Sequence, residues 1–158
     1  MDFKNVVIDK ITLNDSVKSS FDIRYNDKPL YIYSPKLYIP FGVENYKNSY
    51  SLSLQLRNMD TYENLKKFSE FIQELEKHFI ELLDISEDEL TSQIKLNTDN
   101  KYDPILYTKF ISKYNKVEVE VKNHNNEPLN IFDIEKNNYC KCLLYLDKVW
   151  KFNSYTYK

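Results

Sequence analysis

The sequence predicts a mainly β fold that is interrupted by one helical insertion. Polar and apolar residues alternate strictly in residues 50–57 and 116–122, as they do in half-buried strands. Between these stretches, the apolar residues of segment 60–83 instead recur every three or four positions, which is typical of an amphipathic helix. Strand patterns therefore lie on both sides of a helical insertion at about residues 60–96. The 158 residues are expected to form one domain.

Extended segments are expected in the first third of the chain, at residues 3–13, 20–25, 30–33, 37–41 and 50–57. The Asn-Asp-Lys-Pro sequence at 26–29 is typical of a turn. Pro35 and Pro40 exclude a helix and favour edge or bulged strands. In the clearest strand, the even-numbered positions from Tyr50 to Leu56 are apolar, whereas Arg57 lies on the polar face.

The pattern of apolar residues changes near Asn58, just before the helical insertion. Asp60 is expected as the N-cap of a helix of about twenty residues. Its apolar stripe comprises Tyr62, Leu65, Phe68, Phe71, Ile72, Leu75, Phe79, Leu82 and Leu83. Residues 86–89 (Ser-Glu-Asp-Glu) have the spacing of a capping box, which predicts a second, shorter helix to about Leu96.

Strand patterns return after a polar turn at 97–104. We expect strands at residues 116–122, 129–134, 140–146 and 149–157, while residues 106–111 fit either a strand or a helix. The strand at 116–122 should face solvent, and the apolar strand at 140–146 should be buried on both faces. Asp147 and Lys148 allow a tight turn before the last strand.

Charge is segregated along the chain. The net charge is −2, but residues 60–90 contain ten acidic and three basic residues. The remainder contains 14 acidic and 19 basic residues, a net charge of +5. This asymmetry permits one acidic and one basic face. The 14 tyrosines carry less weight, because AT-rich coding also produces a chain rich in Lys, Asn, Tyr, Ile and Phe.

Several classes of protein are disfavoured. No stretch approaches the roughly 18 apolar residues of a membrane span, and no secretory leader is visible, so a cytoplasmic location without membrane contact is expected. Cys140 and Cys142 are interpreted as buried thiols in a reducing compartment. His78 and His124 lack partners at metal-ligand spacing, and the single glycine excludes glycine-rich phosphate loops. We therefore expect no enzyme activity, catalytic residue, metal or cofactor.

Two aromatic and basic stretches, residues 29–42 and 148–158, interleave ring faces with lysines. This chemistry suits unpaired nucleic-acid bases and the phosphates that join them. Lysine dominance favours nonspecific phosphate contact over base readout. The candidate nucleic-acid-binding residues are Tyr31, Tyr33, Lys36, Tyr38, Phe41, Arg57, Lys148, Trp150, Lys151, Tyr155 and Tyr157.

Each candidate ring could instead belong to the core. Tyr31 and Tyr33 share one strand face and Leu30 and Ile32 the other, and the pattern does not decide which pair is buried. Trp150 fits a core position as well as a stacking platform, and Phe41 is interpreted as buried. Tyr155 and Tyr157 alternate with polar residues and are expected to be exposed. Arg57 could meet a phosphate or only water.

Four parts of the sequence together resemble one group of proteins. They are residues 34–43 (Ser-Pro-Lys-Leu-Tyr-Ile-Pro-Phe-Gly-Val), the strand at 50–57, the Phe- and Glu-rich helix that follows it, and the C-terminal residues 140–158. The group is the single-stranded-DNA-binding proteins of large nucleocytoplasmic DNA viruses, related to the phage T7 type. Similar proteins are expected on cytoplasmic linear plasmids with virus-like replication.

The resemblance implies a five-stranded oligonucleotide-binding barrel with extra strands, and with helices between its third and fourth strands. By position it marks residues 34–36, residues 40–42 and Trp150 with the two residues that follow, and Gly42 should mark a turn or a close backbone approach. The chain departs from the family pattern at Asn153, where glycine is frequent, and it ends at Lys158 without an acidic tail.

The leading hypothesis is therefore a sequence-independent single-stranded-DNA-binding protein that acts in DNA replication. It would contact replication proteins through the acidic helical face, and it could form a homo-oligomer. Two alternatives remain open at this point. One is a protein-interaction or virion module with the same fold, and the other is a binder of single-stranded RNA.

Overall fold

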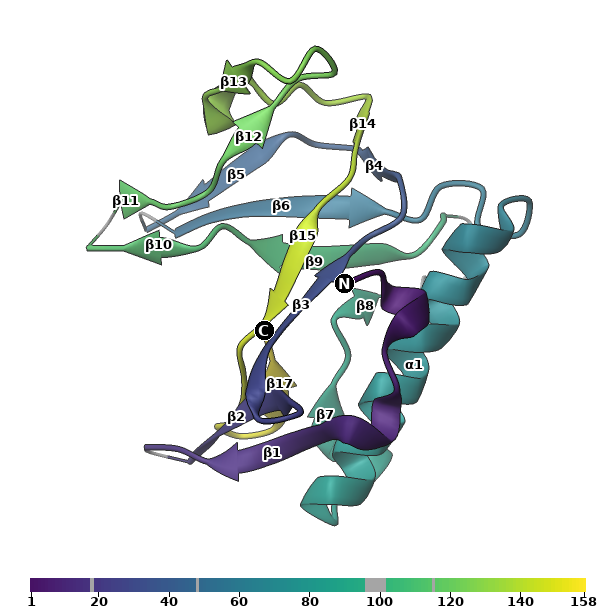
Figure 1. Cartoon of the computed structure of the whole chain (residues 1–158), viewed down its shortest axis with the longest axis vertical. Coiled ribbons are helices and arrows are strands. Elements are labelled where there is room, and N and C mark those ends of the chain that lie inside the picture. Colours follow the sequence, from purple (N-terminus) through teal and green to yellow (C-terminus); the bar gives the residue numbers. More distant parts are fainter. Residues whose placement is uncertain (18, 48, 96–101, 115) are drawn as a thin grey trace. The chain divides into compact units, whose positions relative to one another are not determined.

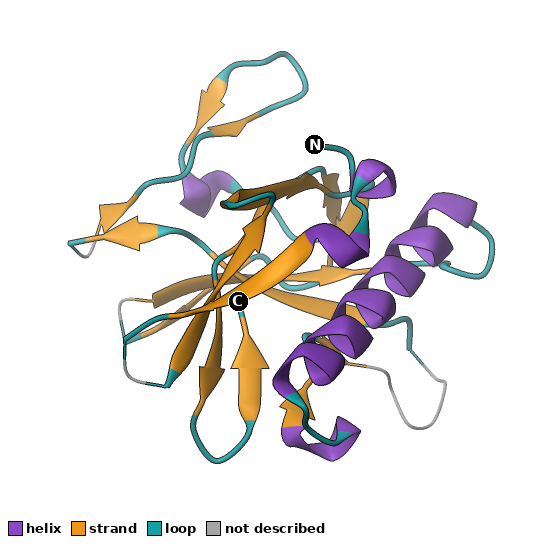
Figure 2. Cartoon of the chain, turned by 60° about the horizontal axis from the view of Figure 1, so that its bottom comes forward, coloured by secondary structure: helices purple, strands orange, loops and turns teal. Residues whose placement is uncertain are grey.

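The computed structural model describes residues 1–17, 19–47, 49–95, 102–114 and 116–158. The described chain is mainly β, with one α-helix and several sheets, and none of these sheets closes into a barrel (Figures 1 and 2). It divides into two compact units. Unit 1 comprises residues 1–36, 58–95 and 141–158, and unit 2 comprises residues 37–57 and 96–140.

Unit 1 contains a twisted sheet with the strand order β15-β3-β2-β16-β17-β7, and β1 also pairs with β2. The strands of unit 1 are β1 Ile11–Asp15, β2 Ser20–Tyr25, β3 Lys28–Tyr33, β7 Leu90–Thr91, β8 Ile94–Lys95, β15 Leu143–Leu146, β16 Lys148–Lys151 and β17 Tyr155–Tyr157. All pairings in this sheet are antiparallel except that of β17 with β7. The predicted turn at 26–29 is confirmed as the β2–β3 connection, with Asn26 and Asp27 at positive φ.

The predicted long helix is confirmed as α1, Glu63–Leu83, which packs against the N-terminal turns and the C-terminal strand. Its buried side chains are Leu65, Phe68, Ser69, Phe71, Ile72, Leu75 and Phe79. Phe79 meets Tyr157 edge to face, with ring centroids 5.5 Å apart. Tyr62, rather than Asp60, is the N-cap, and Leu82 at the other end is exposed.

The second helix expected after Ser86 is a single 3-10 turn, η3 (Glu87–Glu89). The capping box is formed, because Glu89 accepts hydrogen bonds from both the backbone and the side chain of Ser86. The chain then turns away, since Oε1 of Glu76 on α1 accepts from the Ser92 hydroxyl and the Gln93 amide, at 2.8 and 3.1 Å. A contact distant in the sequence therefore overrides the local helix signal, and Leu96 lies outside the described residues.

The N-terminal segment also differs from its expected strand. Two 3-10 turns, η1 (Phe3–Asn5) and η2 (Ile8–Lys10), precede β1. Phe3 is buried against α1, with its ring centroid 5.2 Å from that of Phe68. Within residues 1–11 only Phe3 and Ile11 are fully buried, so the turns do not bury every second side chain as a half-buried strand would.

Unit 2 is built on a sheet with β14, β4, β6 and β9 in order, and with β5 paired to β6. The elements of unit 2 are β4 Leu37–Ile39, β5 Val43–Tyr46, β6 Ser49–Gln55, β9 Ile105–Lys109, β10 Ser112–Lys113, β11 Lys116–Val117, β12 Val121–Lys122, β13 Pro128–Leu129, η4 Ile131–Asp133 and β14 Asn138–Cys140. The predicted strand at 50–57 is confirmed as β6, and the ambiguous segment forms β9. The expected strand at 116–122 is two short strands, β11 and β12, that belong to separate hairpins.

The prediction of a strand buried on both faces at 140–146 is wrong. The segment is divided between β14 and β15, and Leu143 is 54% exposed. Cys140 and Cys142 are thiols outside any disulfide, and both are half-buried rather than fully buried. β15 pairs with β3 on one side only and forms the end of the unit 1 sheet, which explains its exposure. No helix in the described part of the chain is both long and apolar enough to cross a bilayer.

Tyr157 fastens the last strand to the helix. Its hydroxyl donates a 2.6 Å hydrogen bond to Oε1 of Glu76. Burial, together with this carboxylate, raises the pKa of the Tyr157 phenol well above its ordinary value, so the phenol stays protonated and remains a donor. We predict that Tyr157→Phe lowers the free energy of unfolding by about 1–2 kcal/mol, because the half-buried Glu76 carboxylate loses one of its hydrogen-bond donors. Urea unfolding measures this change.

Tyr33→Phe is the matched control, because the Tyr33 side chain is 55% exposed. It should leave the free energy of unfolding almost unchanged. Equal effects of the two substitutions would show that the Tyr157 hydroxyl contributes nothing specific to the attachment of β17.

Candidate nucleic-acid interface

One face of the unit 1 sheet points away from α1 and is called the outer face below. It carries Asp22 and Arg24 on β2, Tyr31 and Tyr33 on β3, Leu143 and Tyr145 on β15, and Lys148 and Trp150 on β16, followed by Phe152. The register pairs Tyr31 with Tyr145, Tyr33 with Leu143 and Lys148 with Asp22. Directly opposed residues of antiparallel strands share a face, so these side chains lie on one side of the sheet.

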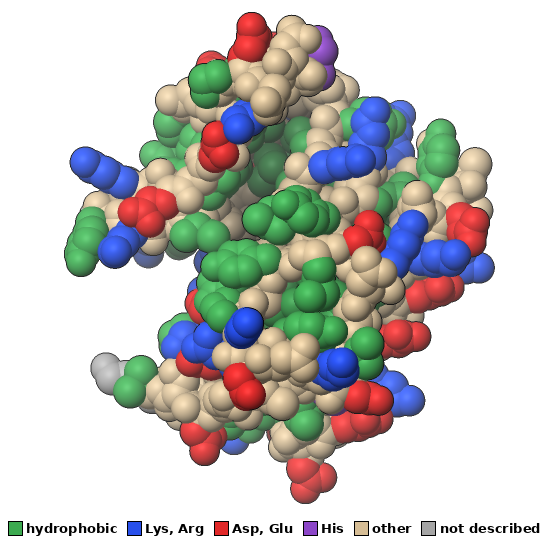
Figure 3. All heavy atoms as spheres, in the orientation of Figure 1, with side chains coloured by type: hydrophobic (Ala, Val, Ile, Leu, Met, Phe, Trp, Pro, Cys, Tyr) green, Lys and Arg blue, Asp and Glu red, His purple; other side chains and the backbone are tan. Residues whose placement is uncertain are grey.

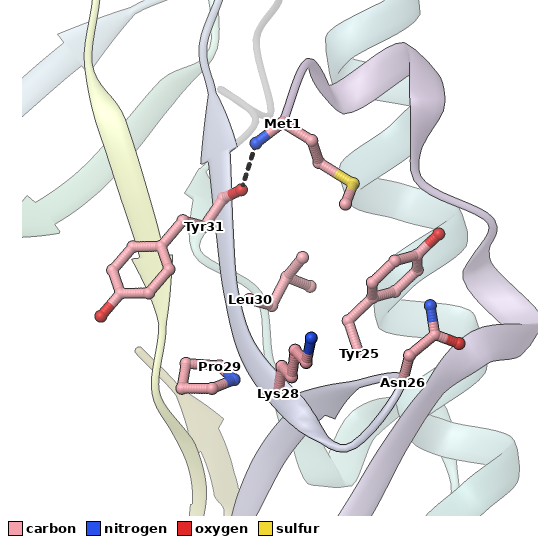
Figure 4. A pocket seen from close by; sticks show the side chains of 7 residues that line it. All are labelled: Met1, Tyr25, Asn26, Lys28, Pro29, Leu30 and Tyr31. Carbon is pink, nitrogen blue, oxygen red and sulfur yellow. Dashed lines mark hydrogen bonds between the residues drawn. The ribbon is translucent and has the colours of Figure 1, made fainter.

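The pictures agree with this placement. In Figure 4, the ring of Tyr31 lies on the opposite side of β3 from the side chains of Leu30 and Met1. All three residues are among those that line a surface hollow of about 390 Å³. The amino group of Met1 donates to the Tyr31 carbonyl at 2.8 Å and so helps to hold β3 in place. In the space-filling view, hydrophobic side chains gather over β3 and β15, with Lys and Arg side chains at the margin (Figure 3).

Tyr31 and Tyr145 form the first aromatic pair of the outer face. Their rings are stacked, with centroids 4.8 Å apart and an interplanar angle of 19°, and Tyr31 is 43% exposed. The Tyr145 hydroxyl donates to Oδ1 of Asp147 at 3.0 Å. Burial, and then this carboxylate, raises the pKa of Tyr145 to about 12. Tyr145 is therefore uncharged at neutral pH and held in orientation, and the Tyr31 ring stacked on it is open to solvent.

Trp150 and Phe152 form the second aromatic pair. The rings are nearly parallel, at 8°, with centroids 6.3 Å apart. Trp150 is half-buried, while Phe152 is 76% exposed. The ammonium groups of Lys148 and Lys158 lie 5.6 and 5.9 Å from the Trp150 ring centroid. Exposed ring surface and positive charge thus occur together at this end of the outer face.

Asp22 organises the cations of the outer face. Its carboxylate forms an ion pair with Lys148 at 2.8 Å and accepts a hydrogen bond from Arg24 at 2.9 Å. Lys148, and then Arg24, hold the pKa of Asp22 below its ordinary value. Lys148 also donates to the Ser16 hydroxyl at 2.8 Å. One carboxylate therefore fixes two cations in place and partly neutralises them.

The predictions for Tyr155 and Tyr157 as exposed platforms are wrong. The two rings are 8% and 4% exposed and lie on the inner face of the sheet. They share this face because they alternate with Thr156, which pairs with Trp150 of the outer face. Lys151 pairs with Tyr155, and its ammonium group lies 5.1 Å from the centroid of that ring. Lys151 therefore lies on the inner side of the sheet, whereas Lys148 lies on the outer face.

Three of the predicted nucleic-acid-binding residues, Tyr38, Phe41 and Arg57, belong to unit 2. The guanidinium of Arg57 lies 4.4 Å from the ring centroid of Tyr38. Phe41 is 61% exposed, which contradicts its interpretation as a core residue. The neighbouring Gly42 has φ +80°, and a Cβ there would lie 3.6 Å from the Ile134 carbonyl. The positive φ agrees with the expected turn at Gly42, whereas 3.6 Å is an ordinary van der Waals distance and shows no unusually close backbone approach.

The Ser-Pro-Lys segment at 34–36 joins β3 to β4. Ser34 is buried; its amide donates to the Cys142 carbonyl at 2.8 Å, and its hydroxyl accepts from the Cys142 amide at 2.9 Å. Ser34 thus has a structural role in tying the end of β3 to the start of β15. Lys36 is exposed in the segment that follows β3.

Sequence reasoning missed Tyr145, Phe152, Arg24 and Asp22 as members of the outer face. Tyr145 was assigned to a strand that was expected to be buried on both sides. The sequence offered no signal for the exposed face, because Leu143, Leu144, Tyr145 and Leu146 are all apolar. Phe152 lies two positions after Trp150, a spacing that places both on one face of a strand, but it was not among the predicted binding residues.

Comparisons with protein-family models, with curated proteins and with solved structures found no match. Within the described residues, no group of three or more His, Cys, Asp or Glu side chains is arranged to hold a metal ion. His78 instead donates through Nε2 to the Ile11 carbonyl at 2.9 Å and joins α1 to β1.

The ion pairs of Asp22 predict a pH dependence of stability. Because the pKa of Asp22 is lower in the folded chain, its contribution is fully present above the unfolded value, about 3.9, and is lost as the pH falls through the folded value. Asp22→Asn should therefore flatten the loss of stability below about pH 5. Urea unfolding across this pH range measures the change. Asp27→Asn, in the exposed β2–β3 turn, should retain the wild-type profile; an unchanged Asp22→Asn profile would contradict the assignment.

Proposed function

We propose that this chain is a non-catalytic protein that binds single-stranded DNA without sequence preference during DNA replication. The observation that carries the proposal is the outer face of unit 1, where two stacked aromatic pairs lie beside Arg24, Lys148 and Lys158. Ring faces accept any base, since every base has a π-face, and ammonium groups follow the phosphate backbone.

The charge of unit 1 outside its acidic helical segment supports the same ligand. Outside residues 60–90, unit 1 contains 11 basic and 6 acidic residues, whereas unit 2 contains 8 of each. The whole basic excess of the chain outside the helical segment therefore belongs to the unit that carries the outer face. Positive potential there would attract a polyanion and speed its association.

We also propose what the sequence resemblance implies. The chain would then be related to viral and plasmid single-stranded-DNA-binding proteins, contain an oligonucleotide-binding barrel and act in the cytoplasm. This proposal is supported by the position of α1 between strand-rich segments. The proposal also includes replication partners on the acidic side of α1, where Glu63, Glu70, Glu74 and Glu81 are exposed, and a homo-oligomer when bound along DNA.

The first test is a fluorescence titration of the single tryptophan with a dT oligonucleotide at two salt concentrations. Binding should change the emission of Trp150, and the affinity should fall with salt with a logarithmic slope of about −0.7 per phosphate contacted. An affinity that does not change with salt, or no binding, would contradict the proposal. Competition with a uridine oligonucleotide separates DNA from RNA, and preference for RNA would overturn the choice of DNA.

Phe152 gives a test of stacking that does not disturb the core, because its ring is 76% exposed. Phe152→Ala should weaken dT binding about tenfold, as expected for the loss of one stacked base. Leu82→Ala removes an exposed apolar side chain from α1 and should leave the affinity unchanged. If both variants bind like the wild type, the Trp150–Phe152 pair is not a platform.

Asp22 should oppose binding, because it occupies two cations of the outer face. Asp22→Asn is expected to raise the affinity for dT and to steepen the logarithmic salt slope by about 0.7 for each cation released. Asp84→Asn, which removes the same charge at the end of α1, should change neither. A lower affinity for Asp22→Asn, in a variant that still unfolds cooperatively on heating, would mean that Asp22 only positions Lys148 and Arg24.

A further inference from the structure

Unit 2 has a row of aromatic and basic side chains of its own. The register pairs Tyr139 on β14 with Tyr38 on β4, and Tyr38 with Gln55 on β6. Arg57 follows Gln55 by two positions, and its guanidinium lies over the Tyr38 ring. Tyr38, Tyr139 and Arg57 therefore share one side of the unit 2 sheet and are called the unit 2 row below.

The contacts within the unit 2 row fix it while leaving it open to solvent. The Tyr38 hydroxyl donates to Oδ1 of Asn137 at 2.7 Å, which sets the plane of the ring. Tyr139 meets Tyr38 edge to face, with centroids 5.2 Å apart and an angle of 61°. Tyr139 is 46% exposed, and Arg57 is exposed as well.

Arg57 differs in its electrostatic setting from Arg24 of the outer face. Arg24 is held by Asp22, whereas none of the ion pairs formed among the described residues involves Arg57. A guanidinium stacked on a tyrosine keeps its edge donors directed outward, in a fork that matches two phosphate oxygens. The unit 2 row thus combines an exposed ring with a phosphate-binding group at stacking distance.

We propose that the unit 2 row is a second nucleotide-binding site, which takes an unpaired base against Tyr139 and Tyr38 and the adjoining phosphate on Arg57. The proposal deepens the proposed function and rests on it for the class of ligand. It adds that each unit binds its own short segment of single-stranded nucleic acid. The outer face of unit 1 and the unit 2 row share no residue, so they can be disabled separately.

The test uses a dT oligonucleotide of about four nucleotides, near the smallest site size of such proteins. Calorimetry counts all bound oligonucleotides, while fluorescence of the single tryptophan reports on unit 1, where Trp150 lies. The wild type should bind about two oligonucleotides per chain by calorimetry. Tyr139→Ala with Arg57→Ala should remove one of them and leave the fluorescence titration unchanged. Tyr114→Asn, at an 89% exposed position of unit 2 with positive φ, is the matched control and should retain both.

The outcomes separate the two proposals. One bound oligonucleotide that is unaffected by the Tyr139 and Arg57 substitutions overturns the second site and leaves the proposed function intact. A single oligonucleotide that is lost with either those substitutions or Phe152→Ala indicates one shared site and also overturns the inference. A single oligonucleotide lost only with the Tyr139 and Arg57 substitutions supports the unit 2 row and overturns the assignment to unit 1. No binding overturns both proposals.

Discussion

The burial of the apolar stripe of α1 is the constraint on which the rest of unit 1 depends. The helix needs a surface to cover its phenylalanines, and Phe3, Tyr157 and the start of β1 provide it. Because strand side chains alternate, the choice of one inner face decides the outer face of every strand in the sheet. Tyr157 lies inside for this reason, and Trp150 lies outside.

The cations of the two units are held in different ways, and this difference has physical consequences. On the outer face of unit 1, Asp22 fixes Lys148 and Arg24 in place. These side chains therefore lose little conformational entropy when they bind a phosphate. The phosphate must, however, displace the Asp22 carboxylate or bind beside its negative charge. In unit 2, Arg57 is oriented by an aromatic ring instead, which leaves its charge unopposed at short range. The first arrangement favours a weak, salt-sensitive contact, and the second favours a directional contact.

The sequence predicted the elements whose signals are local. The helix at 63–83 and the strand β6 follow from periodicity alone. The sequence did not predict which face of an alternating strand is buried, because that depends on packing between distant segments. Tyr157 is inside because of Glu76, 81 positions earlier, and the helix after Ser86 stops at one turn because Glu76 also binds Ser92. The candidate site was predicted in part for the same reason: Tyr31, Tyr33, Lys148 and Trp150 lie on the outer face, whereas Tyr145 and Phe152 required the register.

The hairpin between β16 and β17 has an evolutionary consequence. Three residues, Phe152 to Ser154, separate the two strands, and the Phe152 amide donates to the Ser154 carbonyl at 3.1 Å. Adding or deleting one residue there would exchange the two sides of β17, moving Thr156 inward and both tyrosines to solvent. Substitutions at Asn153 would leave the side assignment unchanged. Descendants of this sequence should therefore vary freely in the identity of that residue while conserving the length of the turn.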